Sequence, residues 1–413
     1  MIPEYADLAC GEIINSARAA AYAEGRCLLS ACDPCPDLAT ALNDMPYVDP
    51  VTDPAPWYDP NLPESGNFLG VMGMSAAGFS ASTISRTPVQ LVGDGAALGV
   101  ARRAHREILY TVLLLALDDC ALSYALEWLS AALQGGPCSG ACGGSELGVY
   151  ACCPTGDGTG ELRHLYAVGL LDGPQITTAT YFPDGIIAEV TFTLAAAVPW
   201  IYREPLDTGS DWVQLSAGTP LTFDPDEVYG ECLEATPCLD DPTCPPPPLP
   251  VRAPVPVDAC YPTGSAAFYR SVVALSPVDQ PEWLEAVPVL ELETGASALR
   301  RVIVRFWANP LGGDCMDVAD PCAACTDIQI PYLPAGSTLT VDGRTQTAEV
   351  DCPQGALGTG TSTPTLYGPL GGSFEWPVFS CPTGLCIEIL STQASTAADA
   401  RARVLLVPRS DVG

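Results

Sequence analysis

The chain has 413 residues, of which 48% are hydrophobic and 16% charged, so a disordered, solvating polypeptide is excluded and two or three globular domains are expected. Its 49 acidic and 17 basic residues give a formal net charge of −32. This charge repels phosphate and argues against sequence-specific binding of nucleic acid. No run approaches the roughly 20 apolar residues that a membrane span needs, so a membrane partner is not expected.

Residues 1–65 are predicted to form an extended N-terminal arm. Asp and Pro alternate in CDPCPDL and in PYVDPVTDPAPWYDPNLPES too densely for a helix or a central strand. The segment Glu12–Glu24 is the one helix candidate in this region. We expect the arm to pack on another surface, such as a neighbouring subunit.

Residues 66–240 carry the pattern of an α+β domain. Arg102–Leu117 is apolar and β-prone, and the stretch DDCALSYALEWLSAALQGG that follows predicts a helix capped by Asp118 or Asp119. Apolar and polar residues then alternate over Ala188–Leu194, which is typical of a strand with one buried face. The prediction is a sheet with one prominent helix.

Residues 241–256 are predicted to be a linker, and residues 257–413 a β-sandwich. Pro245–Pro248 favours polyproline II, a stiff spacer of about 3.1 Å per residue. Beyond it, short alternating runs are separated by Gly, Pro and Asp turns, with no second long amphipathic helix. The predicted strands lie at 290–293, 302–307, 338–342, 387–389 and 401–407.

Nineteen cysteines are unusual for a chain that shows neither the basic start nor the apolar stretch of a signal peptide. CDPC and CAAC have the spacing of zinc ligands, but about 290 residues separate them, so we favour disulfides over a shared zinc ion. Redox catalysis is disfavoured because neither pair lies between a strand and a helix start. The candidate disulfide or zinc cysteines are Cys32, Cys35, Cys138, Cys142, Cys152, Cys153, Cys322 and Cys325.

The sequence offers no catalytic constellation. Its two histidines, His105 and His164, are accompanied by no GxSxG motif, so a Ser-His-Asp or Cys-His site is not expected. GDGAALG lacks the glycine spacing and the lysine of a phosphate loop, and we interpret it as a plain loop. No catalytic residue, cofactor or resident metal is therefore assigned, and the protein is predicted not to be an enzyme.

Several segments, taken in order, resemble the distal-tail-like minor tail proteins of long-tailed (siphovirus) phages of actinobacteria. The absence of lysine among the basic residues also suits a GC-rich source. The resembling segments are EIINSARAAAYAEG, DPAPWYDPNLPESGNFLGV, ASTISRTPVQLVGDGAALGVARRAHREI, ALEWLSAAL, GIIAEVTFTLAAAVPWIYREP, IPYLPAGSTLTVDGR and LYGPLGGSFEWPVFSCPTGLCIEI.

The resemblance implies a tail-tube-like ring domain, a β-sandwich with one helix, followed by a galectin-like β-sandwich. It implies a hexameric ring of this chain at the junction of tail tube and tail tip or baseplate, with the tail tube protein, the tail hub and the tape measure as partners. Such a virion protein assembles in the host cytoplasm and lets DNA pass. We expect the ring contacts around Ala101–Leu117, and acidic side chains facing the lumen.

Two other functions remain open at this point. A carbohydrate-binding adhesin or hydrolase at the host cell surface would use aromatic side chains of the C-terminal sandwich as stacking platforms, although core positions are the favoured interpretation of these residues. A cysteine-rich zinc-binding assembly protein would bind stoichiometric zinc. The aromatic candidates are Trp283, Trp307, Trp376, Tyr332 and Tyr367.

Overall fold

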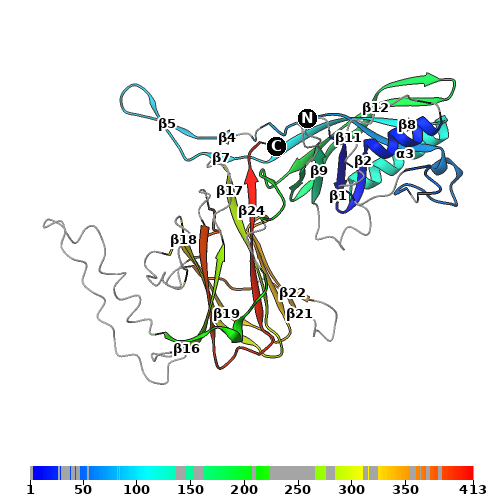
Figure 1. The fold of residues 1–413 in the computed structure, drawn as a ribbon. Helices are drawn as coiled ribbons and strands as arrows, with labels where there is room; N and C mark the ends of the chain where they lie inside the picture. Colours follow the sequence, from blue (N-terminus) through cyan, green and yellow to red (C-terminus); the bar gives the residue numbers. More distant parts are fainter. Residues whose placement is uncertain are drawn as a thin grey trace. The chain divides into compact units, whose positions relative to one another are not determined.

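The chain divides into two compact units, which are described separately here (Figure 1). Unit 1 comprises Met1–Glu204 and Arg409–Gly413, and unit 2 comprises Pro205–Pro408. The chain passes from unit 1 to unit 2 after Glu204, upstream of the predicted domain boundary at 240. The predicted linker 241–256 lies outside the described residues. The computed structural model describes residues 3–26, 28, 38, 42, 47–53, 55–80, 82, 84–135, 146–151, 161–206, 211–223, 266–275, 284–309, 315, 324–352, 360–362, 364–368, 373–379 and 384–412.

Unit 1 is an α+β fold with two α-helices among its described residues. The helices are α1 (Ser16–Gly25) and α3 (Asp119–Leu133), and Pro63–Gly66 forms a 3₁₀ turn. The strands are β1 (Tyr5–Leu8), β2 (Gly11–Asn15), β3 (Phe68–Ala77), β4 (Ile84–Ser85), β5 (Pro88–Gln90), β6 (Ala96–Leu98), β7 (Arg102–Arg103), β8 (Arg106–Ala116), β9 (Leu147–Ala151), β10 (Glu161–Leu165), β11 (Val168–Phe182), β12 (Gly185–Ala196) and β13 (Ile201–Tyr202).

Two antiparallel sheets enclose the core of unit 1 together with the helices. One sheet has the order β11-β12-β8-β3, and in the other β2, β1, β9, β10 and β13 follow one another. The predicted alternation over Ala188–Leu194 is confirmed, since Ala188, Val190, Phe192 and Leu194 are all buried. The predicted helix is confirmed as well, with the Asp118 side chain accepting a hydrogen bond from the Ala121 backbone amide at 2.8 Å.

The segment assigned above to an extended arm contributes to this core. Residues 5–25 form β1, β2 and α1, and Ile13, Ile14 and Tyr22 are buried in the cluster shared with β8 and β12. Farther along, the Trp57 indole donates a hydrogen bond to the Phe68 carbonyl at 2.9 Å and packs against Trp128. The physical reason is that β1 pairs with β9, about 140 residues away, a partner that local alternation cannot reveal.

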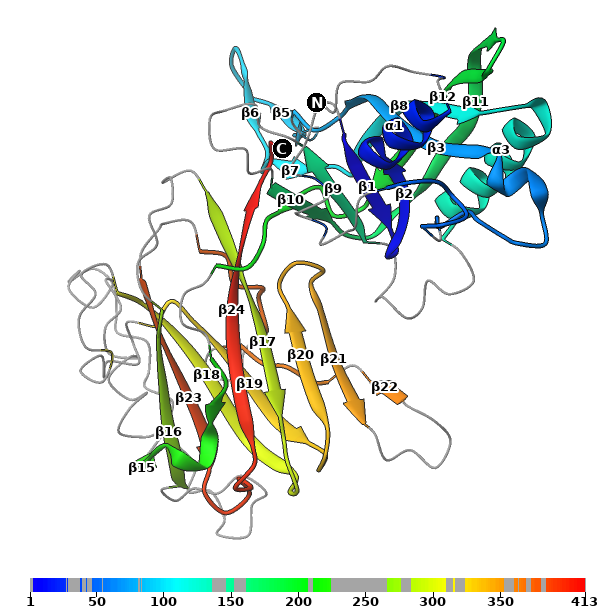
Figure 2. The ribbon, with the colours of Figure 1, turned by 45° about the vertical axis from the view of Figure 1, so that its right-hand side comes forward.

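Unit 2 is a β-sandwich, as the sequence predicts (Figure 2). One sheet has the order β15-β16-β23-β18-β19; in the other β24, β17, β20, β21 and β22 follow one another, with β14 paired to β24. The strands are β14 (Val213–Gln214), β15 (Thr219–Phe223), β16 (Ala266–Leu275), β17 (Glu285–Glu293), β18 (Leu299–Asn309), β19 (Thr326–Leu333), β20 (Thr338–Asp342), β21 (Thr347–Cys352), β22 (Gly360–Ser362), β23 (Gly384–Thr392) and β24 (Arg401–Ser410).

The two sheets of unit 2 share one apolar core. Val304, Phe306 and Ile389 come from the first sheet, while Leu292 and Val404 come from the second. The last two residues of β24 belong to unit 1, where Arg409 pairs with Tyr202 and Ser410 with Ile201. Unit 2 is therefore inserted between β13 and the last two residues of β24, which are hydrogen-bonded to each other in unit 1.

Candidate interaction surfaces

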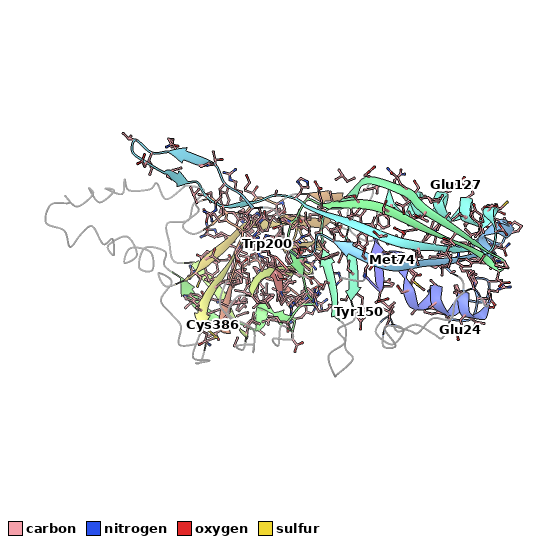
Figure 3. All side chains as sticks on the ribbon, turned by 90° about the horizontal axis from the view of Figure 1, so that it is seen from above. Glu24, Met74, Glu127, Tyr150, Trp200 and Cys386 are labelled. Atoms are coloured by element: carbon pink, nitrogen blue, oxygen red, sulfur yellow. A yellow bond between two sulfur atoms is a disulfide. The ribbon has the colours of Figure 1, made fainter. Side chains whose placement is uncertain are left out.

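A β-ribbon over residues 84–103 stands out from the rest of unit 1 (Figure 1). Strand β4 pairs with β7 and β5 pairs with β6, and Figure 3 shows the outer part of the ribbon standing clear of the other side chains of unit 1. A two-stranded ribbon has no core of its own and is at best marginally stable in water. The local sequence explains the turn, because Asp94-Gly95 places a glycine at a φ of +103°.

The ribbon exposes apolar side chains along its whole length. Six large ones are more than half exposed: Ile84, Val89, Leu91, Val92, Leu98 and Val100. Large apolar side chains exposed in such number over residues 84–103 favour a site of protein contact. The ribbon also carries Arg86, Arg102 and Arg103 against the single acid Asp94, so it is net positive in a chain of net charge −32.

Strand β11 is a long open edge of the four-stranded sheet. It spans 15 residues, pairs with β12 on one side, and stands first in the strand order. Leu171, Ile176, Tyr181 and Phe182 are all more than 40% exposed. Asp172 is the one charged residue on β11. Pro174 and irregularities in the register with β12 interrupt the edge near Asp172, whereas Ala179–Phe182 pair regularly and leave their outer edge uncharged.

The sheet face opposite the core carries threonine, apolar and acidic side chains. Thr111 lies opposite Thr191, Leu109 opposite Thr193, and Leu113 opposite Glu189 in the register of β8 and β12. The acidic residues on this face are Glu107, Glu189 and Asp172. Within these four strands the single basic residue, Arg106, is buried on the other side, so this open face carries no positive charge from its own strands.

Most of the candidate cysteines lie outside the described residues. These are Cys32, Cys35, Cys138, Cys142, Cys152, Cys153 and Cys322. Cys325 is a free, exposed thiol. Among the described residues, no group of three or more His, Cys, Asp or Glu side chains could hold a metal ion. The choice between disulfides and zinc for these cysteines stays a prediction.

The structure contains a disulfide that sequence reasoning missed. Cys315 and Cys386 are joined across 71 residues of sequence in unit 2, and the buried Trp307 packs beside them. Neither cysteine belongs to a CxxC pair, so spacing gave no signal. In unit 1, Cys10 is also disulfide-bonded.

The two histidines contact carboxylates. His105 Nε2 lies 3.0 Å from Glu107 Oε1 on an exposed surface. His164 is mostly buried, with Nδ1 at 2.7 Å from Glu146 Oε1 and Nε2 at 3.3 Å from Glu204 Oε1. Burial alone would lower the pKa of His164, but hydrogen bonds and charge from Glu146 and Glu204 outweigh it and raise that pKa above its ordinary value.

The aromatic candidates of unit 2 fall into different environments. Trp307 is buried, which removes it as a stacking platform, whereas Tyr332 and Tyr367 are exposed. Trp376 packs edge-on against Phe374 beside the core, and Trp283 lies outside the described residues. Sequence reasoning missed Trp212, whose ring lies under the guanidinium groups of Arg401 and Arg403 at 4.5 and 4.8 Å.

None of the helices among the described residues has the length and apolar character needed to cross a membrane.

No protein-family model matches the chain, and no curated protein matches it. Among solved structures, it is similar to the Dit protein of phage SPP1, described as a paradigm of the hub adsorption apparatus in phages that infect Gram-positive bacteria. The TM-score is 0.35 at 9% identity, over 84% of this chain and 95% of Dit.

The chain is also similar to the baseplate of phage p2 in its activated conformation, solved with Sr and with Ca. Both give a TM-score of 0.37 at 10% identity, over 83% of this chain and 92% of the baseplate chain. At such identities, and with TM-scores below 0.5, these likenesses do not define what the chain does.

Proposed function

We propose that this chain is a non-enzymatic structural protein of a phage tail tip, and that copies of it associate through unit 1 into a ring. The observation that carries the proposal is a pair of surfaces in unit 1 that no other described residue covers, the apolar ribbon 84–103 and the open edge β11. The ordered run of segments that resembles distal-tail-like minor tail proteins of actinobacterial siphoviruses supports it.

The two surfaces favour a closed ring over a two-fold dimer. The ribbon and the β11 edge differ in sequence and shape, so a contact between them uses two different patches, one from each copy. Such a heterologous contact repeats from copy to copy and closes into a ring when the rotation allows it. The net positive ribbon also complements the acidic surface of a second copy, which favours the encounter.

A ring of this kind suits passage of a DNA duplex. The open face of the four-stranded sheet carries threonine, apolar and acidic side chains, with Glu107, Glu189 and Asp172 as its charged residues. If this face lines the lumen, like charge keeps the wall from gripping phosphate. The effect acts within roughly 8 Å in physiological salt, so only side chains on the wall itself matter.

The finer parts of the proposal follow the resemblance. They are a hexameric ring, a position joining the tail tube to the tip or baseplate, partners among the tail tube protein, the tail hub and the tape measure, and assembly in the host cytoplasm. In this proposal the predicted galectin-like sandwich, which is unit 2 in the structure, faces outward from the ring.

The decisive experiment is imaging of the purified full chain by negative-stain microscopy, together with its mass in solution by sedimentation velocity. Closed rings whose mass is a whole multiple of 43.1 kDa are expected. A chain that stays monomeric at every accessible concentration contradicts the proposal. Thr191→Arg tests the lumen separately, since rings of this variant should retain duplex DNA that wild-type rings release.

A further inference from the structure

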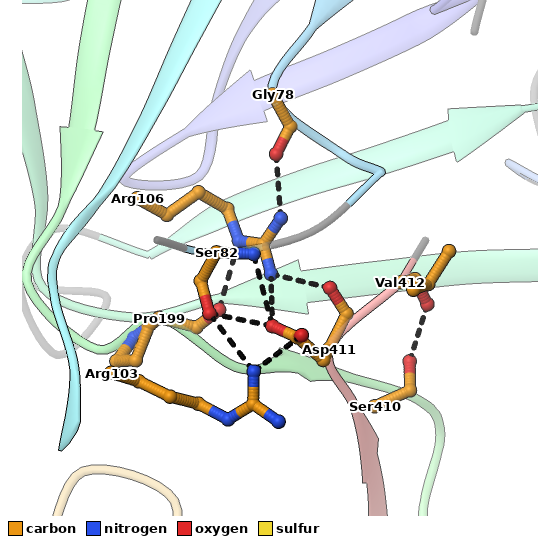
Figure 4. Close-up of polar contacts among 8 residues, drawn as sticks. All are labelled: Gly78, Ser82, Arg103, Arg106, Pro199, Ser410, Asp411 and Val412. Atoms are coloured by element: carbon orange, nitrogen blue, oxygen red, sulfur yellow. Dashed lines mark hydrogen bonds and ion pairs between the residues drawn. The ribbon is translucent and has the colours of Figure 1, made fainter. Parts of the chain in front are cut away.

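The root of the ribbon is held by a residue that lies more than 300 positions away in the sequence. The two arms of the root are Ser82, just before β4, and Arg103, in β7. Both contact Asp411, which belongs to unit 1 although it follows unit 2 along the chain (Figure 4).

The Asp411 carboxylate bridges the two arms directly. Its Oδ1 accepts hydrogen bonds from the Ser82 backbone amide at 3.0 Å and from the Ser82 hydroxyl at 2.6 Å. Its Oδ2 forms an ion pair with Nη1 of Arg103. Arg103 Nη1 also donates to the Ser82 hydroxyl at 3.3 Å, which closes a three-residue network across the root.

Asp411 is in turn fixed to the core of unit 1 through the buried Arg106. Arg106 Nη2 donates to the Asp411 carbonyl at 2.7 Å and lies 3.3 Å from its carboxylate. The same guanidinium donates to the carbonyls of Gly78 and Pro199, at 2.5 and 2.8 Å. A planar guanidinium with several satisfied donors holds its acceptors in one arrangement.

Trp200 also helps to hold the root of the ribbon, by packing against two arginines. Its ring lies beneath the guanidinium of Arg103, with the arginine Cζ 4.5 Å from the ring centroid, and also beneath Arg409, at 4.0 Å. The root therefore has a defined side-chain environment, whereas nearly all of the ribbon beyond it is exposed. Strands β4 and β7 pair over just two residues each, too few to orient the ribbon without such support.

We propose that Asp411 is the positioning residue of the ribbon, and that its contacts fix the orientation in which the ribbon docks onto a second copy. This inference rests on the proposed self-association of unit 1 and adds the residue that controls it. Burial would raise the pKa of Asp411, but the hydrogen bonds from Ser82 and the pairing with Arg103 hold that pKa below its ordinary value, in keeping with an ionised bridge.

The test compares full-length wild type with Asp411→Asn, which keeps the shape of the side chain and removes its charge. We expect the variant to self-associate about tenfold more weakly in sedimentation equilibrium, because a ribbon that is no longer held in its docking orientation has to be ordered on binding. In dilute monomer, hydrogen exchange should speed up over residues 84–103 and stay unchanged over β8 and β12. Asp351→Asn, an exposed carboxylate in unit 2, is the matched control and should change neither.

A double-mutant cycle separates positioning from general stability. In a Val92→Asp background docking of the ribbon is already weakened, so adding Asp411→Asn should weaken association by clearly less than it does in wild type if Asp411 acts through the ribbon. Asp411→Glu should restore part of the affinity. If Asp411→Asn unfolds unit 1, Ser82→Ala, which leaves all charges in place, should still speed exchange in the ribbon and weaken association by a smaller factor.

The results also distinguish the two proposals. If wild type associates while Asp411→Asn leaves both its affinity and the ribbon's exchange unchanged, the positioning role is overturned and the proposed function stands. If wild type does not associate at all, the proposed function fails, and the exchange rates over 84–103 still decide whether Asp411 orders the ribbon.

Discussion

Unit 1 and unit 2 are both built around antiparallel sheets, yet they differ in how many large apolar side chains they leave exposed. Of the large apolar side chains that the described residues leave exposed, only Tyr332, Tyr367 and Val378 belong to unit 2. The others lie in unit 1, and many of them are on the ribbon 84–103 and on β11. The fold class alone therefore does not decide which unit offers contact surfaces.

Unit 2 exposes few apolar side chains and, like unit 1, contains networks of paired charges. Arg305, on the sheet face opposite the core, is buried between Asp327 at 3.3 Å and Glu388 at 3.4 Å, and Glu388 also contacts Arg270. On the other sheet, Arg401 pairs with Glu293 and Arg403 with Glu291 across β24 and β17. These networks pair charges within unit 2. The exposed apolar surface is therefore what distinguishes unit 1, and the proposed association through unit 1 gives the following predictions.

The largest expected effect comes from opening a cavity in one core or the other. Phe192→Ala in unit 1 removes a ring stacked on Tyr110, and Phe306→Ala empties a comparable site in unit 2. Each should lower the free energy of unfolding of its own unit by about 3–5 kcal/mol, measured by urea unfolding with hydrogen exchange to locate the loss. Near the unfolding midpoint of the affected unit, Phe192→Ala should abolish self-association and Phe306→Ala should leave it. If both variants lost self-association equally, association would not depend on unit 1 more than on unit 2.

A charge on the ribbon should have the next largest effect. Val92→Asp places a carboxylate at a fully exposed apolar tip position, and burying it in an interface should cost about 2 kcal/mol or more, about thirtyfold in affinity. Sedimentation equilibrium measures this change. Val378→Asp, an exposed valine in unit 2, is the control, and a similar loss of affinity there would mean that association does not depend on the ribbon.

A lysine on the open edge should weaken association by about tenfold. Ile176→Lys adds to β11 the charge by which natural edge strands avoid pairing, at a side chain that is already partly exposed, so stability should change little. Tyr332→Lys on β19, an edge strand of unit 2, is the matched variant. Association that is insensitive to Ile176→Lys would remove β11 from the interface.

The smallest expected effect is a pH dependence confined to unit 1. The pKa of His164 is raised in the folded protein by Glu146 and Glu204, so its ion pairs contribute fully below the ordinary pKa of about 6.5 and are lost as pH rises through the raised value. The free energy of unfolding of unit 1 should fall by a few tenths of a kcal/mol to about 1 kcal/mol. His164→Gln should flatten the profile, and His105→Gln should leave it unchanged.

Elements with one buried face were predictable from the sequence. Alternation at Ala188–Leu194 predicted β12, and the helical spacing of the leucines that follow Asp118 predicted α3. Both signals exist because burial of one face makes apolar residues recur at a fixed interval. The β-sandwich after the proline tract was visible for the same reason. Strand β11 was not, since its residues from Leu171 to Phe182 bury no face, and without burial no alternation is required.

The interaction surfaces depend on residues that only the fold brings together. GDGAALG was interpreted as a plain loop, which is wrong for Ala96–Leu98, since these residues form β6 of the ribbon. Nothing local reveals that Asp411 would hold the root of the ribbon. The Cys315–Cys386 disulfide likewise has no spacing signal. The proline tract predicted a domain boundary near 241. The boundaries between the two units lie after Glu204 and before Arg409, where the composition of the sequence does not change.

The insertion of unit 2 has a practical consequence for engineering. Tyr202 and Arg409 face each other in a β-ladder, and the Cα atoms of such partners lie only about 4.5–5.5 Å apart. Removing Pro205–Pro408 therefore leaves two ends that a short glycine-containing turn can join, without losing Asp411. A shortened chain made in this way would show whether the proposed assembly forms without unit 2, whereas truncation at the proline tract would cut unit 2 in two.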